Sequence, residues 1–177
     1  MRSLCGVQRY RILPHDSRVW IDASSNVHPI HTEAKGLEGW LELEFDVEAE
    51  VNVDLPPRGH LEYPVENLKS GNPLQDRELR RRIDSRRFPT IAGDLTGMKR
   101  CDDPSRYLVT GELTFRGVKR TYEDEMTIEM PNDHRMTLTG QATFDIRDFG
   151  MEPPRILMLK VHPEVTVRVE IVAELEH

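Results

Sequence analysis

Apolar and polar residues alternate with a period of two along much of this chain. In residues 37–53 nearly every odd position is apolar, whereas most even positions are Glu or Asp. Successive side chains of a strand point to opposite faces, so this run has one apolar and one polar face. Because the run exceeds the usual strand length of about 3–10 residues, we predict two strands or one bent strand.

The same alternation predicts further strands elsewhere. They cover residues 107–115, 122–130, 136–146 and 165–173, with shorter candidates at 7–13, 18–23, 61–68 and 90–98. Turn-forming stretches such as Pro131-Asn132-Asp133 separate them. Regularly spaced strands with little helix are typical of a barrel or sandwich. We therefore expect a mainly all-β single domain over residues 1–174, and we interpret residues 175–177 as a tag remnant.

One segment, Pro73 to Asp84, has the features of a helix. Asn72 is a suitable N-cap, and Pro73 fits the first helical position because its missing N–H is not needed there. Leu79 and Ile83 are four residues apart, so we expect both on one buried face.

Six arginines and three acidic residues crowd residues 76–87, which leaves a local charge of +3. Pairs four residues apart partly neutralise the guanidinium groups. These pairs are Asp76–Arg80, Glu78–Arg82 and Arg80–Asp84. A nucleic-acid surface is usually more broadly basic and mixed with aromatic residues, and here only Phe88 is aromatic. We favour a solvent-exposed, salt-bridged helix face over a phosphate site.

Composition sets limits on partners and location. The chain has 177 residues and a net charge of −7, which argues against general attraction to nucleic acid or anionic membranes. No apolar run reaches the ~18 residues of a membrane span, and none resembles a signal peptide. We expect a cytoplasmic protein. Cys5 and Cys101 are expected to be reduced thiols, although their pairing stays open.

Few residues suggest catalysis or metal binding. His28 and His31 would chelate zinc only if Glu33 or His60 joined them, and this spacing in a proline-containing loop is a weak signal. Asp148-Phe149-Gly150 matches a kinase tripeptide by coincidence, and we interpret it as a strand end at a glycine that bends the backbone. We assign no catalytic residue, metal or cofactor. A hydrolase using interior carboxylates or the His28/His31 pair remains the least favoured alternative.

The interior of a closed sheet is the remaining place for a site. A barrel of about eight strands holds one small ligand at most. Ligand sites are mostly apolar, with a few polar groups that orient the guest. The same apolar residues also suit a filled core, and on pattern alone core packing is favoured. The candidate wall residues are Leu43, Phe45, Leu113, Phe115, Met126, Ile128, Phe144, Ile146, Val167 and Val169.

Several motifs, in order, resemble those of the YceI-like family over residues 10–173. LKSGNPLQDRELRRRIDSRRFPTI resembles the family's turn, helix and return strand, VTGELTFRGV its Gly-x-Leu-Thr-x-Arg-Gly hairpin, and FDIRDFGM its late Arg-x-Asp-Phe-Gly segment. The matching positions are Ser17, Val19 and Gly39 near the start, and Gly71, Asn72, Asp76, Leu79, Phe88, Pro89, Gly111, Leu113, Thr114, Arg116, Gly117, Arg147, Asp148, Phe149 and Gly150 in these segments.

This resemblance implies a lipocalin-like antiparallel β-barrel of about eight strands, with one short helix near residues 73–84. It further implies non-enzymatic binding or carriage of a hydrophobic, isoprenoid-like or amphiphilic lipid within the barrel. Arg147 would orient a polar head group, or it would lie outside, bonded to Asp145 or Asp148, which we favour. The alternative is a barrel with a filled core that acts as a protein-interaction or assembly module.

The segment PPRILMLKVHP, residues 153–163, departs from the family pattern because it is an apolar run between prolines. It lines the tunnel mouth, forms a dimer interface or touches a membrane. Exposed apolar patches usually mark contacts between proteins, so a homodimer is the favoured interpretation.

Overall fold

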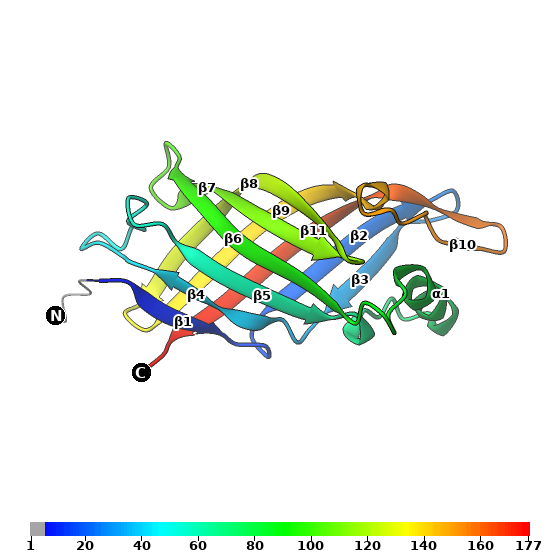
Figure 1. Cartoon of the computed structure of the whole chain (residues 1–177), viewed down its shortest axis with the longest axis horizontal. Helices are drawn as coiled ribbons and strands as arrows, with labels where there is room; N and C mark the ends of the chain where they lie inside the picture. Colours follow the sequence, from blue (N-terminus) through cyan, green and yellow to red (C-terminus); the bar gives the residue numbers. More distant parts are fainter. Residues whose placement is uncertain (1–5) are drawn as a thin grey trace.

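The computed structural model describes residues 6–177 as an elongated antiparallel barrel (Figure 1). Its strands are β1 (Gln8–Ile12), β2 (Arg18–Ser25), β3 (Ile30–Ala34), β4 (Glu38–Leu43), β5 (Arg58–Pro64), β6 (Thr90–Arg100), β7 (Arg106–Phe115), β8 (Val118–Asn132), β9 (Arg135–Asp145), β10 (Arg155–Ile156) and β11 (Leu159–Leu175). The α-helix is α1 (Pro73–Ile83), and two short 3-10 helices are η1 (Val65–Asn67) and η2 (Ile146–Phe149).

Strand pairing closes the sheet into the predicted eight-stranded barrel. The order runs β1-β4-β5-β6-β7-β8-β9-β11, and β1 pairs with β11 to complete the circle. Strand β11 also pairs with β2, which carries β3 on its outer edge. Leu175 belongs to β11, where it pairs with Tyr10. The last residue of the predicted domain is therefore not the last residue of the sheet.

The two ends of the barrel differ in what covers them. The loop over residues 44–57, the start of β1 and the end of β11 lie at one end, whereas α1, β10 and the turn between β2 and β3 lie at the other (Figure 1). We call these the loop end and the helix end.

The predicted strand pattern over residues 37–53 is only half correct. Strand β4 ends at Leu43, and the residues beyond it form the loop of the loop end, held by one isolated bridge between Phe45 and Val51. The carboxylate of Asp46 accepts backbone hydrogen bonds from Glu48 and Glu50, which turns the chain back on itself. Alternation therefore continues at the two bridge residues although the segment between them is a turn.

Helix α1 forms as its sequence predicts. The Asn72 side chain accepts from the N–H groups of Leu74 and Gln75, and Asp84 ends the helix in a left-handed conformation. Ile83 is buried and Leu79 packs against the core, so both lie on the expected face.

The ion pairs of α1 only partly match expectation. Glu78 pairs with Arg82 as predicted, and also with Arg81. The other two predicted pairs are wrong for the described residues. Asp76 instead accepts from the N–H and hydroxyl of Ser70, which pins the helix start to the preceding loop.

Other differences are local. Strand β3 was not predicted, because its five residues directly follow Pro29 and the stretch with His28 and His31 was interpreted as a proline-containing loop. The candidate strand 61–68 turns into η1 after Pro64, and β9 gives way to η2 before Gly150, whose positive φ of 69° provides the expected bend. Gly39 has φ of 146° and lies so close to the carbonyl of His60 that no other residue fits.

None of the helices within residues 6–177 is long and apolar enough to cross a bilayer. Cys101 is a half-buried free thiol, whereas Cys5 lies outside the described residues.

Candidate ligand-binding site

Two adjoining cavities occupy the barrel interior. The larger has a volume of about 400 Å³ and the smaller about 230 Å³. Because they share wall residues, they form one elongated space along the barrel. The shared residues are Leu61, Gly93, Leu113, Phe144, Val167 and Val169.

The larger cavity lies toward the helix end. Its wall combines inward-facing residues of β2 and β3, such as Ile21 and Ile30, with Leu79 and Ile83 of α1. Pro154 and Val161, which flank the β10–β11 hairpin, complete this wall. The helix therefore contributes its apolar face to the cavity rather than to a separate core.

Small residues in the strands create the smaller cavity. Gly93, Gly111, Gly140 and Ala142 all lie in its wall. A Cβ atom added to Gly140 would lie 3.0 Å from the Met126 side chain, so the glycine makes room for that methionine. Where large side chains would otherwise meet across the barrel, the sequence leaves space.

One acidic side chain faces this apolar space. Asp124 lies two residues from Tyr122 and from Met126 on β8, so all three share a face, and its partner across the sheet is the half-buried Val109. It makes no hydrogen bond or ion pair with any residue in the described part of the chain. Burial raises the pKa of the Asp124 carboxyl above its ordinary value.

Two tyrosine hydroxyls in the cavity walls also lack partners. The buried hydroxyls of Tyr63 and Tyr122 accept or donate no hydrogen bond within the described residues. Tyr122 lies edge-on to Phe144, with ring centres 4.6 Å apart, where the two cavities meet. Unpaired polar groups of this kind are costly in a protein interior unless water or a ligand satisfies them.

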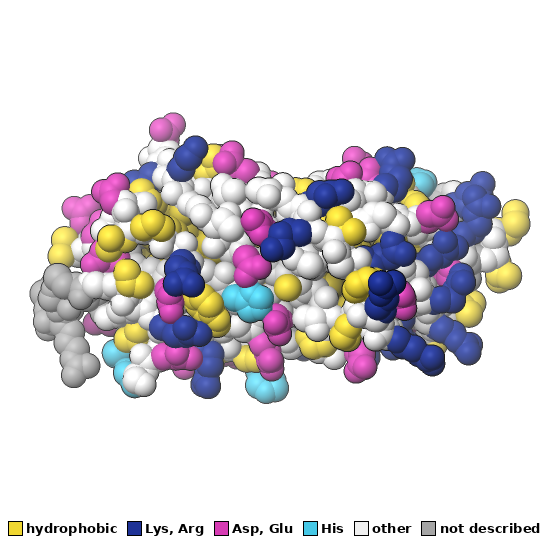
Figure 2. All heavy atoms as spheres, viewed as in Figure 1, with side chains coloured by type: hydrophobic (Ala, Val, Ile, Leu, Met, Phe, Trp, Pro, Cys, Tyr) yellow, Lys and Arg dark blue, Asp and Glu magenta, His cyan; other side chains and the backbone are white. Residues whose placement is uncertain are grey.

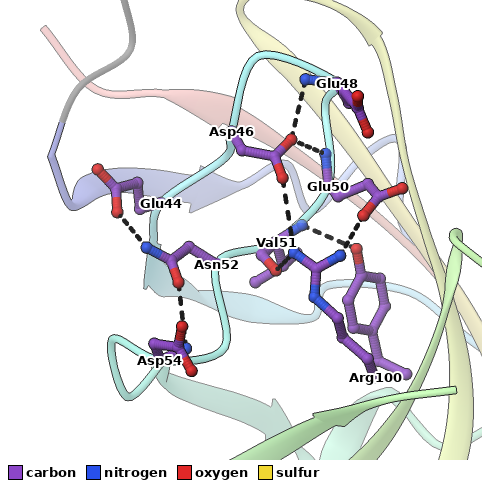
Figure 3. A network of polar contacts seen from close by, with 9 residues as sticks. Glu44, Asp46, Glu48, Glu50, Val51, Asn52, Asp54 and Arg100 are labelled. Atoms are coloured by element: carbon purple, nitrogen blue, oxygen red, sulfur yellow. Dashed lines mark hydrogen bonds and ion pairs between the residues drawn. The ribbon is translucent and has the colours of Figure 1, made fainter.

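The loop end is closed by packing and by a polar network (Figure 3). Val51 is fully buried, and its N–H donates to the Tyr107 hydroxyl over 2.8 Å. Arg100 donates to the Val51 carbonyl and pairs with Glu50 and Asp46, which fastens the loop to β6. The cavity therefore extends toward the helix end.

The predicted site residues, which are the ten wall candidates and Arg147, fall into three groups. Seven of the eleven candidates line the cavities, and they are Leu113, Phe115, Met126, Phe144, Ile146, Val167 and Val169. Leu43, Phe45 and Ile128 are buried in the packed core near the loop end instead. Arg147 lies outside, paired with Asp145 over 2.6 Å, which is the arrangement that the sequence favoured.

Other wall residues were missed by sequence reasoning. Asp124, Tyr63 and the residues of α1 and β3 belong to this set. The parity of β8 carried a usable signal for Asp124, because it occupies the same alternate positions as Met126 and Ile128. No comparable local signal indicated that α1 would cover the cavity.

None of the histidines belongs to the described wall of either cavity. His31 pairs with Asp22 over 2.6 Å, and His28 contacts the Pro29 carbonyl. His60 lies on the barrel exterior between Asp94 and Glu62, whose carboxylates raise its pKa above the ordinary value. Within the part of the chain that the structure describes, no group of three or more His, Cys, Asp or Glu is arranged to hold a metal ion.

Solved structures with the same fold include three bacterial proteins. A polyisoprenoid-binding domain from Saccharophagus degradans, implicated in plant cell wall breakdown, is 11% identical, with a TM-score of 0.73 over 94% of this chain and 98% of its own. BcnA of Burkholderia cenocepacia is 17% identical, with a TM-score of 0.75 over 91% and 98%. A YCEI protein of Campylobacter jejuni is 14% identical, with a TM-score of 0.63 over 87% and 85%.

These likenesses establish the fold, and the family follows from the sequence itself. No curated protein matches the chain significantly. The family model described as a YceI-like domain matches residues 10–173, the span over which the motifs resembled that family. The closed barrel, its covering helix and this match together show that the chain belongs to the YceI-like domain family.

Proposed function

We propose that this protein binds a long hydrophobic molecule, isoprenoid-like or an amphiphilic lipid, inside the barrel and carries it without catalysing a reaction. The observation that supports this most is the pair of joined apolar cavities, the larger of about 400 Å³. That volume lies within the range of small-molecule sites, about 300–1,000 Å³. The polyisoprenoid-binding relative of the same fold adds to this support.

The elongated shape suits a chain-like guest. A linear apolar molecule lying along the barrel would contact the shared residues, Val167 and Phe144 among them, in both cavities. Removing such a guest from water contributes about 25 cal/mol for each Å² of apolar surface, so binding needs no catalytic group.

A polar end of the guest has defined partners. Asp124 and Tyr122 belong to the wall of the smaller cavity, and Tyr63 belongs to the wall of the larger. A guest that donates a hydrogen bond, for example through a hydroxyl, would satisfy the Asp124 carboxylate. Arg147 is ion-paired on the exterior and has no part in this proposal.

A barrel with a filled core would instead act as an interaction module. The empty interior volume disfavours that alternative. The hydrolase alternative is weakened because no histidine is among the described wall residues of either cavity.

Extraction of the protein purified under mild conditions tests the proposal. Native mass spectrometry is expected to show a bound apolar molecule that organic solvent releases. The Phe115→Asp/Phe144→Asp variant should lose that molecule, and circular dichroism reports whether it still folds. A folded wild-type protein that carries no guest and takes up no added prenol would contradict the proposal.

A further inference from the structure

The hairpin between β10 and β11 exposes two large apolar side chains at its tip. Leu157 is 90% exposed and Met158 is 84% exposed. Ile156 pairs with Leu159, so Leu157 and Met158 form the whole turn between the two strands. Leu157 has a φ of 53°, a conformation that two-residue turns usually assign to Asn or Gly. The sequence therefore places apolar side chains where neither burial nor backbone preference favours them.

One more exposed apolar side chain, that of Val27 in the β2–β3 turn, lies beside this tip. The backbone N–H of Asn26 donates to Lys160, and the Asn26 side chain bonds both Lys160 and the carbonyl of Met158. This ties the β2–β3 turn to the hairpin, and it sets Val27, 65% exposed, next to the tip. The apolar tip is thus the set Val27, Leu157 and Met158.

Basic residues surround the apolar tip. Arg155 and Lys160 are exposed and pair across the hairpin directly behind it. Helix α1 contacts β10, and Arg82 reaches Glu152 over 3.5 Å. Figure 2 shows Lys and Arg side chains gathered over this end of the molecule, with hydrophobic atoms at its extremity.

Most of the six arginines in residues 77–87, of which Arg86 and Arg87 follow α1, have no acidic partner. Arg81 and Arg82 share Glu78, whereas Arg77, Arg80, Arg86 and Arg87 form no ion pair within the described residues. Residues 76–87 carry a local charge of +3, whereas the whole chain has a net charge of −7. The helix end is therefore basic although the protein as a whole is acidic. The sequence-based interpretation of a salt-bridged helix face, partly neutralised by its acidic residues, therefore holds for only two of the six arginines.

We propose that the helix end docks onto an anionic phospholipid bilayer, with Leu157 and Met158 inserted at the interface and the arginines of residues 77–87 against the headgroups. Apolar side chains next to basic ones are the combination that holds proteins at anionic membrane surfaces. The larger cavity lies beneath this end, with residues of α1 and Pro154 in its wall, so docking would place this wall next to the bilayer.

A second copy of this chain fits the surface less well. A two-fold dimer brings the same patch of both copies together, so the arginines of one helix end would face those of the other. Like charges at close range oppose such contact. The bilayer supplies the opposite charge.

The inference deepens the proposed function by naming the source of the guest. Docking is measured without any guest. A protein that does not bind vesicles can therefore still bind a guest in its cavity, and a protein that binds no guest can still dock. The measurement is co-sedimentation with vesicles of phosphatidylcholine alone and of phosphatidylcholine mixed with phosphatidylglycerol. We expect binding only to the mixed vesicles, and weaker binding as salt is raised.

Two variants and their matched controls make the test specific. Arg77→Gln/Arg86→Gln is expected to lower partitioning about 25-fold, since each exposed arginine contributes about fivefold. Leu157→Ser/Met158→Ser is expected to lower it more than about tenfold. The controls are Arg58→Gln/Lys99→Gln, also exposed and without ion pairs in the described chain, and Val47→Ser at the loop end, where Val47 is fully exposed. Neither control should change partitioning.

Three results would overturn docking. The first is equal binding to both kinds of vesicle, and the second is equal losses in the variants and their controls. The third is a wild-type dimer that Leu157→Ser/Met158→Ser converts to monomers, measured by light scattering, because the tip would then be covered by a second copy.

Discussion

The backbone N–H of Val51 donates to the hydroxyl of Tyr107, 56 residues later in the chain. Both residues are almost fully buried, so this bond fixes the loop of residues 44–57 over the loop end of the barrel. Burial also raises the pKa of the Tyr107 hydroxyl, which therefore stays protonated over the ordinary pH range. A single hydroxyl thus links the closure of one end to the wall of the barrel.

Tyr107→Phe is expected to destabilise the protein measurably. It leaves the Val51 N–H buried without an acceptor, which costs about 1–3 kcal/mol in the free energy of unfolding. Urea denaturation followed by circular dichroism measures the change. Tyr122→Phe is the matched control, because the Tyr122 hydroxyl has no partner within the described residues and its loss should cost little. Equal effects of the two changes would contradict the role assigned to the bond.

Ala142→Leu should block the smaller cavity while leaving the barrel folded. Ala142 pairs with Val167 and faces inward, so added carbons enter space that a guest would occupy. We expect binding of the apolar dye Nile red to weaken more than about tenfold, equivalent to about 1.4 kcal/mol. Thr143→Leu, the same new side chain on the exposed face of β9, should leave dye binding unchanged. Unaltered dye binding in Ala142→Leu would place the dye elsewhere.

Asp124→Asn is expected to raise the free energy of unfolding at neutral pH. Because burial raises the pKa of Asp124 in the folded protein, folding favours the protonated acid, and stability falls as pH rises between the unfolded and folded pKa values. The increase in the free energy of unfolding that Asp124→Asn brings should therefore shrink as the pH is lowered through the pKa of Asp124 in the folded protein. Denaturation at several pH values measures it, with Glu123→Gln on the exposed face as control. A variant less stable than wild type at neutral pH would refute the assignment.

His60→Gln tests the exterior cluster. Glu62 first, and Asp94 next, raise the pKa of His60, so the stabilisation is present below the unfolded pKa and is lost as pH rises through the folded one. The variant should be less stable than wild type near pH 6, by less than about 1 kcal/mol, and the difference should vanish toward pH 9. A difference that stays constant over this range would rule out the charge on His60 as its cause.

The sequence predicts the strands well where alternation and packing coincide. Along β9 and β11 the inward positions, such as Leu138 and Ile171, pack in one core, so the period of two survives. The period of two predicts a strand wrongly beyond Leu43. Phe45 and Val51 keep the spacing of a strand there, but Asp46 turns the chain between them. A side-chain hydrogen bond to the backbone overrides a pattern there.

The cavity was harder to predict than the wall. Alternation assigns Leu43 and Phe144 to the same interior, yet only Phe144 meets empty space. The difference depends on the residues nearby in space, because Phe144 shares a cavity wall with small residues of other strands, such as Gly93 and Gly111, and Leu43 does not. The cover supplied by α1 likewise depends on where the helix packs, which its own sequence does not specify.

Strand β11 pairs with β9 along one edge and with β2 and then β1 along the other, and Leu175 joins Tyr10. The circle of strands therefore stays open until residues 173–175 have left the ribosome and paired with β1. Until then the interior faces of the earlier strands stay exposed, and contacts between residues so far apart form slowly. We expect synthesis of this barrel to depend on protection of its nascent strands, with closure as its final and rate-limiting step.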